Sequence, residues 1–224
     1  MAVSSKPSAA DLAEAGINTS TQNLHPHHPN SARYYSVEAS DPLLRGHVFS
    51  LRYASYIAGG YIEANPNRIF TDKYDSQPNC TSYLTYHNAS PMGSIRLCRY
   101  TPNEGWEIPV MNAYAEEIKK EVGLDKPLLE ANRFAVHPGY QRRGGVRARF
   151  SIYRNIPIEA AKAETHCILA AVREEHVRFY KMLQFVPISD CKAYSELKFK
   201  TLLMACFDLE KSRQLVLAQT DRKE

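Results

Sequence analysis

The segment Leu128–Val136 constrains the fold of this 224-residue chain more than any other. Its apolar side chains occupy both alternating faces, which is typical of a strand in the middle of a sheet that is covered on both sides. A turn over residues 137–145 follows, and then a helical pattern through Val146, Phe150 and Tyr153. This order of strand, turn and helix predicts an α/β fold with helices on both faces of a central sheet.

The rest of the pattern predicts a mixed sheet with no internal repeat. Further strands are expected over residues 33–37, 81–87, 92–100, 165–172 and 201–208, the second and third forming an antiparallel hairpin. Helices are expected over residues 42–58, 112–122 and 173–184, and after residue 146 with a break at Pro157. Residues 65–79 hold several turn-forming side chains and are expected to be a loop.

Composition divides the chain into one globular domain and two tails. Residues 1–32 are rich in Ala, Ser, Asn, Pro and His and contain few large apolar side chains. Such a segment cannot offset the entropy lost on ordering, so it is expected to be disordered. Residues 33–210 are expected to form a single domain, and residues 211–224 a polar C-terminal tail.

The cysteines and histidines bear on compartment and metals. The five cysteines are scattered and never form a C-x-x-C pair: Cys80, Cys98, Cys167, Cys191 and Cys206. This pattern is typical of reduced cytoplasmic thiols rather than of a disulfide framework or a zinc site. His25, His27 and His28 are interpreted as solvated side chains, so no metal site is expected. No apolar run approaches the about 20 residues that cross a bilayer, and no secretory signal pattern begins the chain, so we expect a cytoplasmic protein without a transmembrane segment.

Charge is distributed unevenly along the chain. The formal net charge of +4 is too small to indicate nucleic-acid binding by itself. Residues 131–158, however, contain no acidic side chain and carry six arginines: Arg133, Arg142, Arg143, Arg147, Arg149 and Arg154. They predict a locally positive surface that suits an anionic partner. Because few aromatic side chains are interleaved for base stacking, a nucleic-acid partner is not expected.

The turn at residues 137–145 is a possible phosphate site. Backbone N–H groups and the helix dipole favour an anion where a helix begins, and Gly144 and Gly145 allow a ligand to approach closely. Arg142 and Arg143 would add charge-assisted contacts. The alternative is an ordinary strand-to-helix turn with solvated arginines.

Two further groups of charged residues could carry chemistry. Glu130 lies in the buried strand, where a raised pKa would suit a general base, and Arg133 could hold a carboxylate. A structural ion pair is the alternative for Glu130. Two carboxylates in the loop and two guanidiniums elsewhere could clamp an amino acid: Asp72, Asp75, Arg52 and Arg96. They could equally form a charge network that pins the loop.

Four motifs in order resemble the pattern of the acyl-homoserine-lactone synthases, and still more that of the related FeeM-type N-acyl amino acid synthases. They are Arg52-Tyr53-x-x-Tyr56, Asp72-x-Tyr74-Asp75, Gly93-Ser94-x-Arg96-Leu97 and Glu130-x-x-Arg133-Phe134-Ala135-Val136. The turn Gln141-x-x-Gly144-x-Val146 is similar to the acyl-donor loop of the GNAT acyltransferases, with Val146 where Gly or Ala is usual. The helix after residue 173 is similar too, with Gln184 where Gly is usual. The resemblance spans residues 34–208.

The resemblance implies a GNAT-type fold whose mixed central sheet splays between two parallel strands, 128–136 and 165–172. It implies transfer of a long-chain fatty acyl group from an acyl carrier protein thioester to the amine of an amino acid. No cofactor is implied beyond the phosphopantetheine that the donor carries. The lactone synthases usually have a Trp shortly after the first-helix Arg, but the only Trp of this chain is Trp106. Lactone synthesis from S-adenosylmethionine is therefore the alternative, together with a GNAT-like module that binds a thioester without turnover.

The resemblance also implies roles for individual residues. Glu130 would be the base, Arg133 would position it or the acceptor, and Tyr180 would protonate the leaving thiolate. The acyl donor would contact Phe134, Ala135, Val136, Gln141, Arg142, Arg143, Gly144, Gly145 and Val146, with backbone N–H groups near residues 134–136 stabilising the oxyanion. The acceptor pocket would contain Arg52, Tyr56, Asp72, Asp75 and Arg96. The carrier protein would dock on Arg142, Arg143, Arg147, Arg149 and Arg154.

Overall fold

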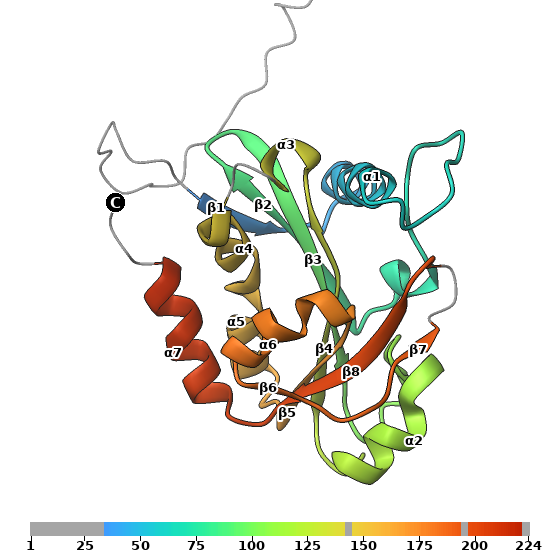
Figure 1. Cartoon of the computed structure of the whole chain (residues 1–224), viewed down its shortest axis with the longest axis vertical. Helices are drawn as coiled ribbons and strands as arrows, with labels where there is room; N and C mark the ends of the chain where they lie inside the picture. Colours follow the sequence, from blue (N-terminus) through green and yellow to red (C-terminus); the bar gives the residue numbers. More distant parts are fainter. Residues whose placement is uncertain (1–33, 142–144, 194–196, 221–224) are drawn as a thin grey trace, which may run out of the picture. The chain divides into compact units, whose positions relative to one another are not determined.

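A mixed sheet runs through the computed structural model, which describes residues 34–141, 145–193 and 197–220 (Figure 1). The strands are β1 (Tyr34–Glu38), β2 (Cys80–His87), β3 (Ser90–Tyr100), β4 (Leu128–Val136), β5 (Cys167–Val172), β6 (Phe185–Pro187), β7 (Lys192–Ala193) and β8 (Lys200–Cys206). Their order is β1-β2-β3-β4-β5-β8-β6, and β7 pairs with β8. Among these described pairings, β4 with β5 is parallel and the others are antiparallel.

Helices cover both faces of the sheet, as the sequence predicts (Figure 1). They are α1 (Pro42–Ala58), α2 (Met111–Glu121), α3 (Pro138–Gln141), α4 (Gly145–Tyr153), α5 (Asn155–Lys162), α6 (Val177–Met182) and α7 (Leu209–Thr220), with 3-10 turns η1 (Lys73–Ser76) and η2 (Glu174–His176). The face under α1 buries Val48, Leu51 and Leu84, whereas α4 and α5 bury Ile152 and Ile156 on the other. None of the helices that the structure describes is both long and apolar enough to cross a membrane.

The sheet splays between β4 and β5, which confirms the expected fold. The two strands pair only from Leu128 to Glu130, opposite residues 167–169. Beyond Glu130, β4 stays paired with β3 and β5 with β8, so the two inner edges separate. A β-bulge lies at the point of separation, because Ser94 and Arg96 pair with residues three apart in β4. Arg133 lies in this bulge with a φ of 49°, in the left-handed region.

The C-terminal residues differ from the prediction. Residues 209–220 form α7, where the sequence predicts a polar tail from residue 211. Ser212 and Val216 are buried, and the helix packs against α4 and α5. The apolar stripe of α7 is narrow, so composition alone favours a solvated segment. The ordered structure therefore extends to residue 220.

Three other elements refine the prediction. The helix expected over residues 173–184 is shorter in the structure. Its first part is the 3-10 turn η2, α6 covers only Val177–Met182, and Gln184 follows α6 with a φ of 69°. Gln184 thus adopts the left-handed conformation that Gly usually supplies after a helix. The expected break near Pro157 falls at Arg154, between α4 and α5, which leaves Pro157 in the first turn of α5. The expected loop 65–79 contains η1.

Candidate active site

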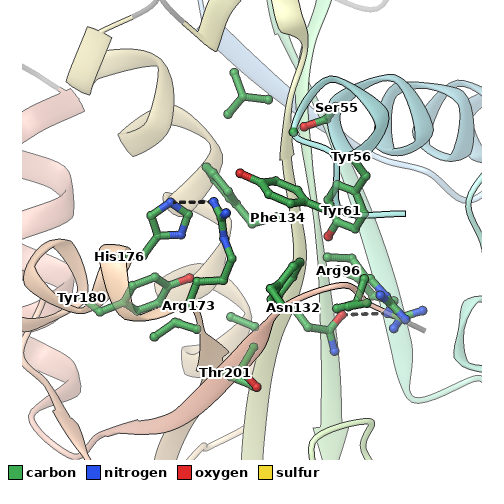
Figure 2. A pocket seen from close by; sticks show the side chains of 18 of the residues that line it. Ser55, Tyr56, Tyr61, Arg96, Asn132, Phe134, Arg173, His176, Tyr180 and Thr201 are labelled. Atoms are coloured by element: carbon green, nitrogen blue, oxygen red, sulfur yellow. Dashed lines mark hydrogen bonds between the residues drawn. The ribbon is translucent and has the colours of Figure 1, made fainter. Parts of the chain in front are cut away.

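A pocket of about 370 Å³ lies where β4 and β5 diverge (Figure 2). The edge of β4 contributes Glu130, Ala131, Asn132, Arg133, Phe134 and Val136 to its lining. The end of β5 and the segment through α6 contribute Arg173, His176 and Tyr180. Figure 2 shows these three on one side of the pocket, with Tyr56 and Arg96 on the other. The strand divergence therefore creates a site between the two halves of the sheet.

Glu130 is the last residue of β4 that pairs with β5, and its side chain is fully buried. Its Oε2 accepts a hydrogen bond from the backbone N of Val110 at 2.8 Å, and its Oε1 accepts one from Asn132 Nδ2 at 2.8 Å. Burial raises the pKa of Glu130 to about 7, against the opposing effect of these two hydrogen bonds and of nearby guanidiniums. A carboxyl group with this pKa exchanges protons readily near neutral pH, as a general base requires.

Asn132 is a site residue that the sequence interpretation missed. Arg96 Nε donates to Asn132 Oδ1 at 2.9 Å, so the amide must turn its Nδ2 toward Glu130. Asn132 lies two residues after Glu130, on the same face of the strand. That spacing was the available signal: a polar side chain two positions from a buried carboxylate. Asn132, and not Arg133, orients the carboxylate.

Removing the Asn132 amide is expected to shift the pH dependence of catalysis. In Asn132→Ala the ionised form of Glu130 loses one donor, so its pKa should rise. We expect the acidic limb of kcat/KM to move up by about one pH unit, since one hydrogen bond contributes about 1 kcal/mol. Asn155→Ala, at a buried amide that bonds to Ser36 and Ile152 instead, is the matched control. A pH profile of Asn132→Ala in which the maximal kcat/KM falls but the acidic limb does not move would contradict the positioning role of Asn132.

The loop carboxylates and three guanidiniums form one buried charge cluster. Arg96 Nη1 lies 2.6 Å from Asp72 Oδ1 and 2.9 Å from Asp75 Oδ1. Arg52 Nη1 lies 2.9 Å from Asp75 Oδ2, and Arg133 Nη2 lies 2.5 Å from Asp72 Oδ2. Arg133 therefore pairs with Asp72 and not with Glu130. With three guanidiniums and two carboxylates, these five side chains carry one excess positive charge.

Electrostatics and local structure hold the cluster in place. Burial would raise the pKa of Asp72, but hydrogen bonds and charges from Arg96 and Arg133 hold it well below its usual value. Burial likewise opposes ionisation of Asp75, and Arg52 with Arg96 lowers its pKa. Both aspartates also cap η1: Asp72 accepts from Tyr74 N, and Asp75 accepts from the backbone N of Asp72.

The cluster changes the interpretation of the predicted acceptor residues. The structure brings Arg52, Asp72, Asp75 and Arg96 together, but Arg96 alone of these four lines the pocket. The side chains of Arg52, Asp72 and Asp75 form ion pairs within the cluster. This agrees with the alternative interpretation, in which a charge network holds the loop of residues 65–79 in place. Tyr56 also lines the pocket, with its ring against Phe70 at 5.2 Å between centroids. Contact with an acceptor stays a prediction for Tyr56 and Arg96.

The predicted donor residues of β4 divide between the two faces. Phe134 and Val136 line the pocket, whereas Ala135 is buried under α1 with Val48 and Leu51. A direct donor contact for the Ala135 side chain is therefore wrong. Residues 135 and 137 direct their N–H groups toward β3, as the bond from His137 N to Met92 O at 2.8 Å shows. Because N–H directions alternate along a strand, those of Phe134 and Val136 point into the gap.

The predicted donor loop is only partly described. Gln141 ends α3, lines the pocket and donates from Nε2 to Val136 O at 3.0 Å. Arg142, Arg143 and Gly144 lie outside the described residues. Gly145 and Val146 begin α4, and a phosphate-binding role for this loop stays a prediction. His25, His27 and His28 also lie outside the described ranges.

Three predicted docking arginines lie in the described part of α4 and just after it. Arg149 and Arg154 are exposed, and Arg149 also lines the pocket. Arg147 is half-buried, with its guanidinium 5.6 Å from the centroid of the Tyr34 ring. Arg149 therefore places positive charge beside the pocket, and Arg154 adds exposed positive charge five residues further along the chain.

Tyr180 lies in the pocket wall with little exposure. Burial raises the pKa of Tyr180 to about 12, so its hydroxyl is protonated at neutral pH. Its ring packs edge-on against Tyr153, and Tyr153 stacks on Phe134 with centroids 4.8 Å apart. The phenol is therefore available as a proton donor, although the raised pKa makes it a weaker acid than an ordinary tyrosine.

Arg173 and His176 were also missed. The Arg173 guanidinium lies 4.0 Å from the Tyr61 ring centroid and 5.3 Å from that of Phe199. Its Nη2 lies 3.2 Å from His176 Nε2. Burial and the charge of Arg173 lower the pKa of His176, which makes the neutral ring the acceptor. Among the described residues, no group of three His, Cys, Asp or Glu side chains is arranged to hold a metal.

Comparisons with known proteins agree with this geometry. The model of the family described as N-acyl amino acid synthase FeeM matches residues 47–206. No curated protein sequence matches the chain. The structure is similar to that of FeeM, an N-acyl amino acid synthase from uncultured soil microbes, with a TM-score of 0.70 and 20% identity over 84% of this chain and 97% of that one.

Two other solved structures share the fold. The acyl-homoserine-lactone synthase LasI gives a TM-score of 0.64 and 13% identity, over 87% of this chain and 100% of that one. A protein described as a putative N-acetyltransferase from Lactobacillus plantarum gives 0.53 and 13%, over 77% and 97%. The chain thus has the GNAT-type acyltransferase fold.

Proposed function

Since the chain belongs to the family of FeeM-type N-acyl amino acid synthases, and is therefore an N-acyltransferase, we propose that it moves a long-chain fatty acyl group from an acyl carrier protein to the amine of an amino acid. The observation that carries this proposal is the buried Glu130 carboxyl at the floor of the gap between β4 and β5. A thioester in that gap would have a base of near-neutral pKa on one side and backbone N–H groups on the other.

The transfer follows from these positions. Glu130, directly or through a water, removes a proton from the acceptor ammonium, and the neutral amine attacks the thioester carbonyl. The N–H groups of Phe134 and Val136 stabilise the oxyanion that forms. When the intermediate collapses, the N–C bond is kept and the C–S bond breaks. Tyr180 passes its proton to the departing sulfur. The attacking nitrogen gives up its second proton, which returns Tyr180 to its protonated form, so the products are an amide and a free thiol.

Charge supports the choice of acceptor and donor. The guanidinium groups of Arg96 and Arg133 line the pocket, which suits an acceptor that carries a carboxylate. Exposed Arg149 and Arg154 suit a donor with an acidic surface and a phosphopantetheine arm. The five free cysteines fit a reducing compartment, so we place the reaction in the cytoplasm.

Product formation tests the proposed function. The full chain would be incubated with a long-chain acyl carrier protein thioester and a mixture of amino acids, and the products analysed by mass spectrometry. We expect an N-acyl amino acid. A parallel incubation with S-adenosylmethionine in place of the amino acids tests lactone synthesis. Product in that incubation alone would overturn the choice of acceptor, and no product in either would overturn the proposal.

Reversing the charge of Arg154 is expected to weaken use of the carrier protein. In Arg154→Glu the KM for the carrier-bound donor should rise severalfold and become less sensitive to salt, because a favourable contact with an acidic partner is lost. The KM for acyl-pantetheine without the carrier should not change, since Arg154 does not line the pocket. Lys120→Glu, at an exposed cation on α2, is the control. Equal effects of the two variants would contradict docking on this surface.

A further inference from the structure

Cys80 in β2 and Cys98 in β3 face each other across the antiparallel ladder, and both thiols are free. The backbone N of Arg99 donates to the O of Asn79 at 2.8 Å, and these residues flank the pair. This bond makes Cys80 and Cys98 a non-hydrogen-bonded pair, in which the Cα atoms are about 4.5 Å apart and the side chains lie closest. That separation is within the about 4.4–6.8 Å that a disulfide spans.

The two thiols differ in access. Cys80 is half-buried, whereas Cys98 is fully buried. Burial and a hydrogen bond from the Cys98 thiol to Cys80 raise the pKa of Cys98. An oxidant from solvent would therefore react with Cys80, and Cys98 is placed to resolve the product.

Cys98 also contacts the group that orients the base. Asn132 Nδ2 lies 3.6 Å from Cys98 Sγ and 2.8 Å from Glu130 Oε1, so the same amide group bonds to both. Cys98 and Glu130 are register partners in β3 and β4. A bond from Cys98 to Cys80 would draw the sulfur away from Asn132. The amide that holds Glu130 would then lose one of its contacts.

We propose that Cys80 and Cys98 form an oxidative modification site, at which a peroxide converts the two thiols into a cross-strand disulfide that slows acyl transfer. The Cys80 thiol gives up its proton and its sulfur attacks the peroxide; the O–O bond breaks, the departing hydroxide takes up that proton as water, and a sulfenic acid remains on Cys80. The Cys98 sulfur then attacks Cys80 Sγ and the S–O bond breaks. The departing hydroxide takes the Cys98 proton as water, so the two sulfurs together supply the two electrons that reduce the peroxide. A dithiol reductant reverses the step by thiol–disulfide exchange.

Peptide mapping tests the modification without reference to activity. The full chain is treated with hydrogen peroxide, unfolded in an alkylating reagent, digested and analysed by mass spectrometry. We expect a peptide pair joined through Cys80 and Cys98 that disappears after treatment with dithiothreitol and is absent from Cys80→Ser. Exposed Cys191 is the internal control for the action of the oxidant. Recovery of Cys80 and Cys98 as separate alkylated peptides, when Cys191 has been oxidised, would overturn the proposal.

Activity tests the coupling to Glu130, and this part rests on the proposed function. Because misplacing a catalytic group by about 1 Å can slow a reaction about 10²-fold, we expect turnover of the oxidised enzyme to fall at least about tenfold and to recover on reduction. Cys80→Ser should keep its turnover in peroxide. A mapped disulfide with unchanged turnover would overturn the coupling. Absence of turnover in the reduced enzyme would instead overturn the proposed function, and the mapping would still decide the modification.

Discussion

Replacing Glu130 by Gln is expected to lower kcat/KM by about 10²–10⁴-fold, the usual contribution of a positioned general base. The amide cannot accept a proton from the acceptor ammonium, whereas the wild-type carboxylate can. In the wild type, kcat/KM should rise as the pH passes through about 7, because Glu130 acts in its ionised form. The variant should lack this limb. Turnover measured across pH 5.5–8.5 with the carrier-bound donor checks both expectations, and an unchanged kcat/KM would remove Glu130 from catalysis.

The stability of the same variant shows whether its fold is intact. Glu130 has an ordinary pKa of 4.5 and a folded-state pKa of about 7, so the folded state binds the extra proton between these values. Its contribution to the free energy of unfolding is fully present below pH 4.5 and is lost as the pH rises through about 7. Glu130→Gln should lack this decline. Because Val110 N and Asn132 Nδ2 both donate to the carboxylate, Glu130→Asp is a second variant that keeps an acceptor-only group.

Replacing Asp72 by Ala is expected to destabilise the protein by about 3–5 kcal/mol, the usual cost of removing one partner of a buried ion pair. Asp72 pairs with both Arg96 and Arg133, and the three side chains are at most 8% exposed. Without it, two buried guanidiniums lose their shared counterion. Because the folded-state pKa of Asp72 lies below its ordinary value of 3.8, its contribution is present above that pH and is lost as the pH falls. Urea denaturation at pH 7 measures the loss.

Two further variants make the stability test specific. Asp72→Ala combined with Arg133→Met should recover part of the lost stability, because one of the two guanidiniums that share this counterion is removed with it. Glu210→Ala removes a carboxylate whose partner, Arg213, is exposed, so it should leave the urea midpoint unchanged. An Asp72→Ala midpoint equal to that of the wild type would show that the cluster does not stabilise the fold.

Much of the fold and part of the site could be predicted because they depend on local patterns. The two-sided apolar character of Leu128–Val136 predicts a central strand, and a carboxylate inside such a strand indicates a buried Glu130. The partner of Arg133 could not be predicted, because the bulge and the positive φ at this residue turn its side chain toward Asp72. No short-range pattern encodes that turn. Asn132 could have been found from its two-residue spacing to Glu130.

The remaining misses have tertiary causes. α7 is held by contacts with α4 and α5, so its polar composition is a poor guide. Ala135 belongs to the same sequence motif as Phe134 and Val136, which line the pocket. Because side chains alternate along a strand, that of Ala135 lies on the opposite face, under α1. Arg173 directly follows β5, and its guanidinium lies over the ring of Tyr61, which is far away in sequence; both side chains line the pocket. Side chains brought together in this way are visible only in the folded protein.

A crystal structure with a stable donor analogue tests the central claim most directly. The analogue is an acyl-pantetheine in which an amide N–H replaces the thioester sulfur, so the carbonyl is kept. We predict that the pantetheine lies between β4 and β5, with the carbonyl oxygen within hydrogen-bond distance of the N–H of Phe134 or Val136 and the carbonyl carbon facing Glu130. An analogue bound outside this gap, or a carbonyl turned away from Glu130, would contradict the account.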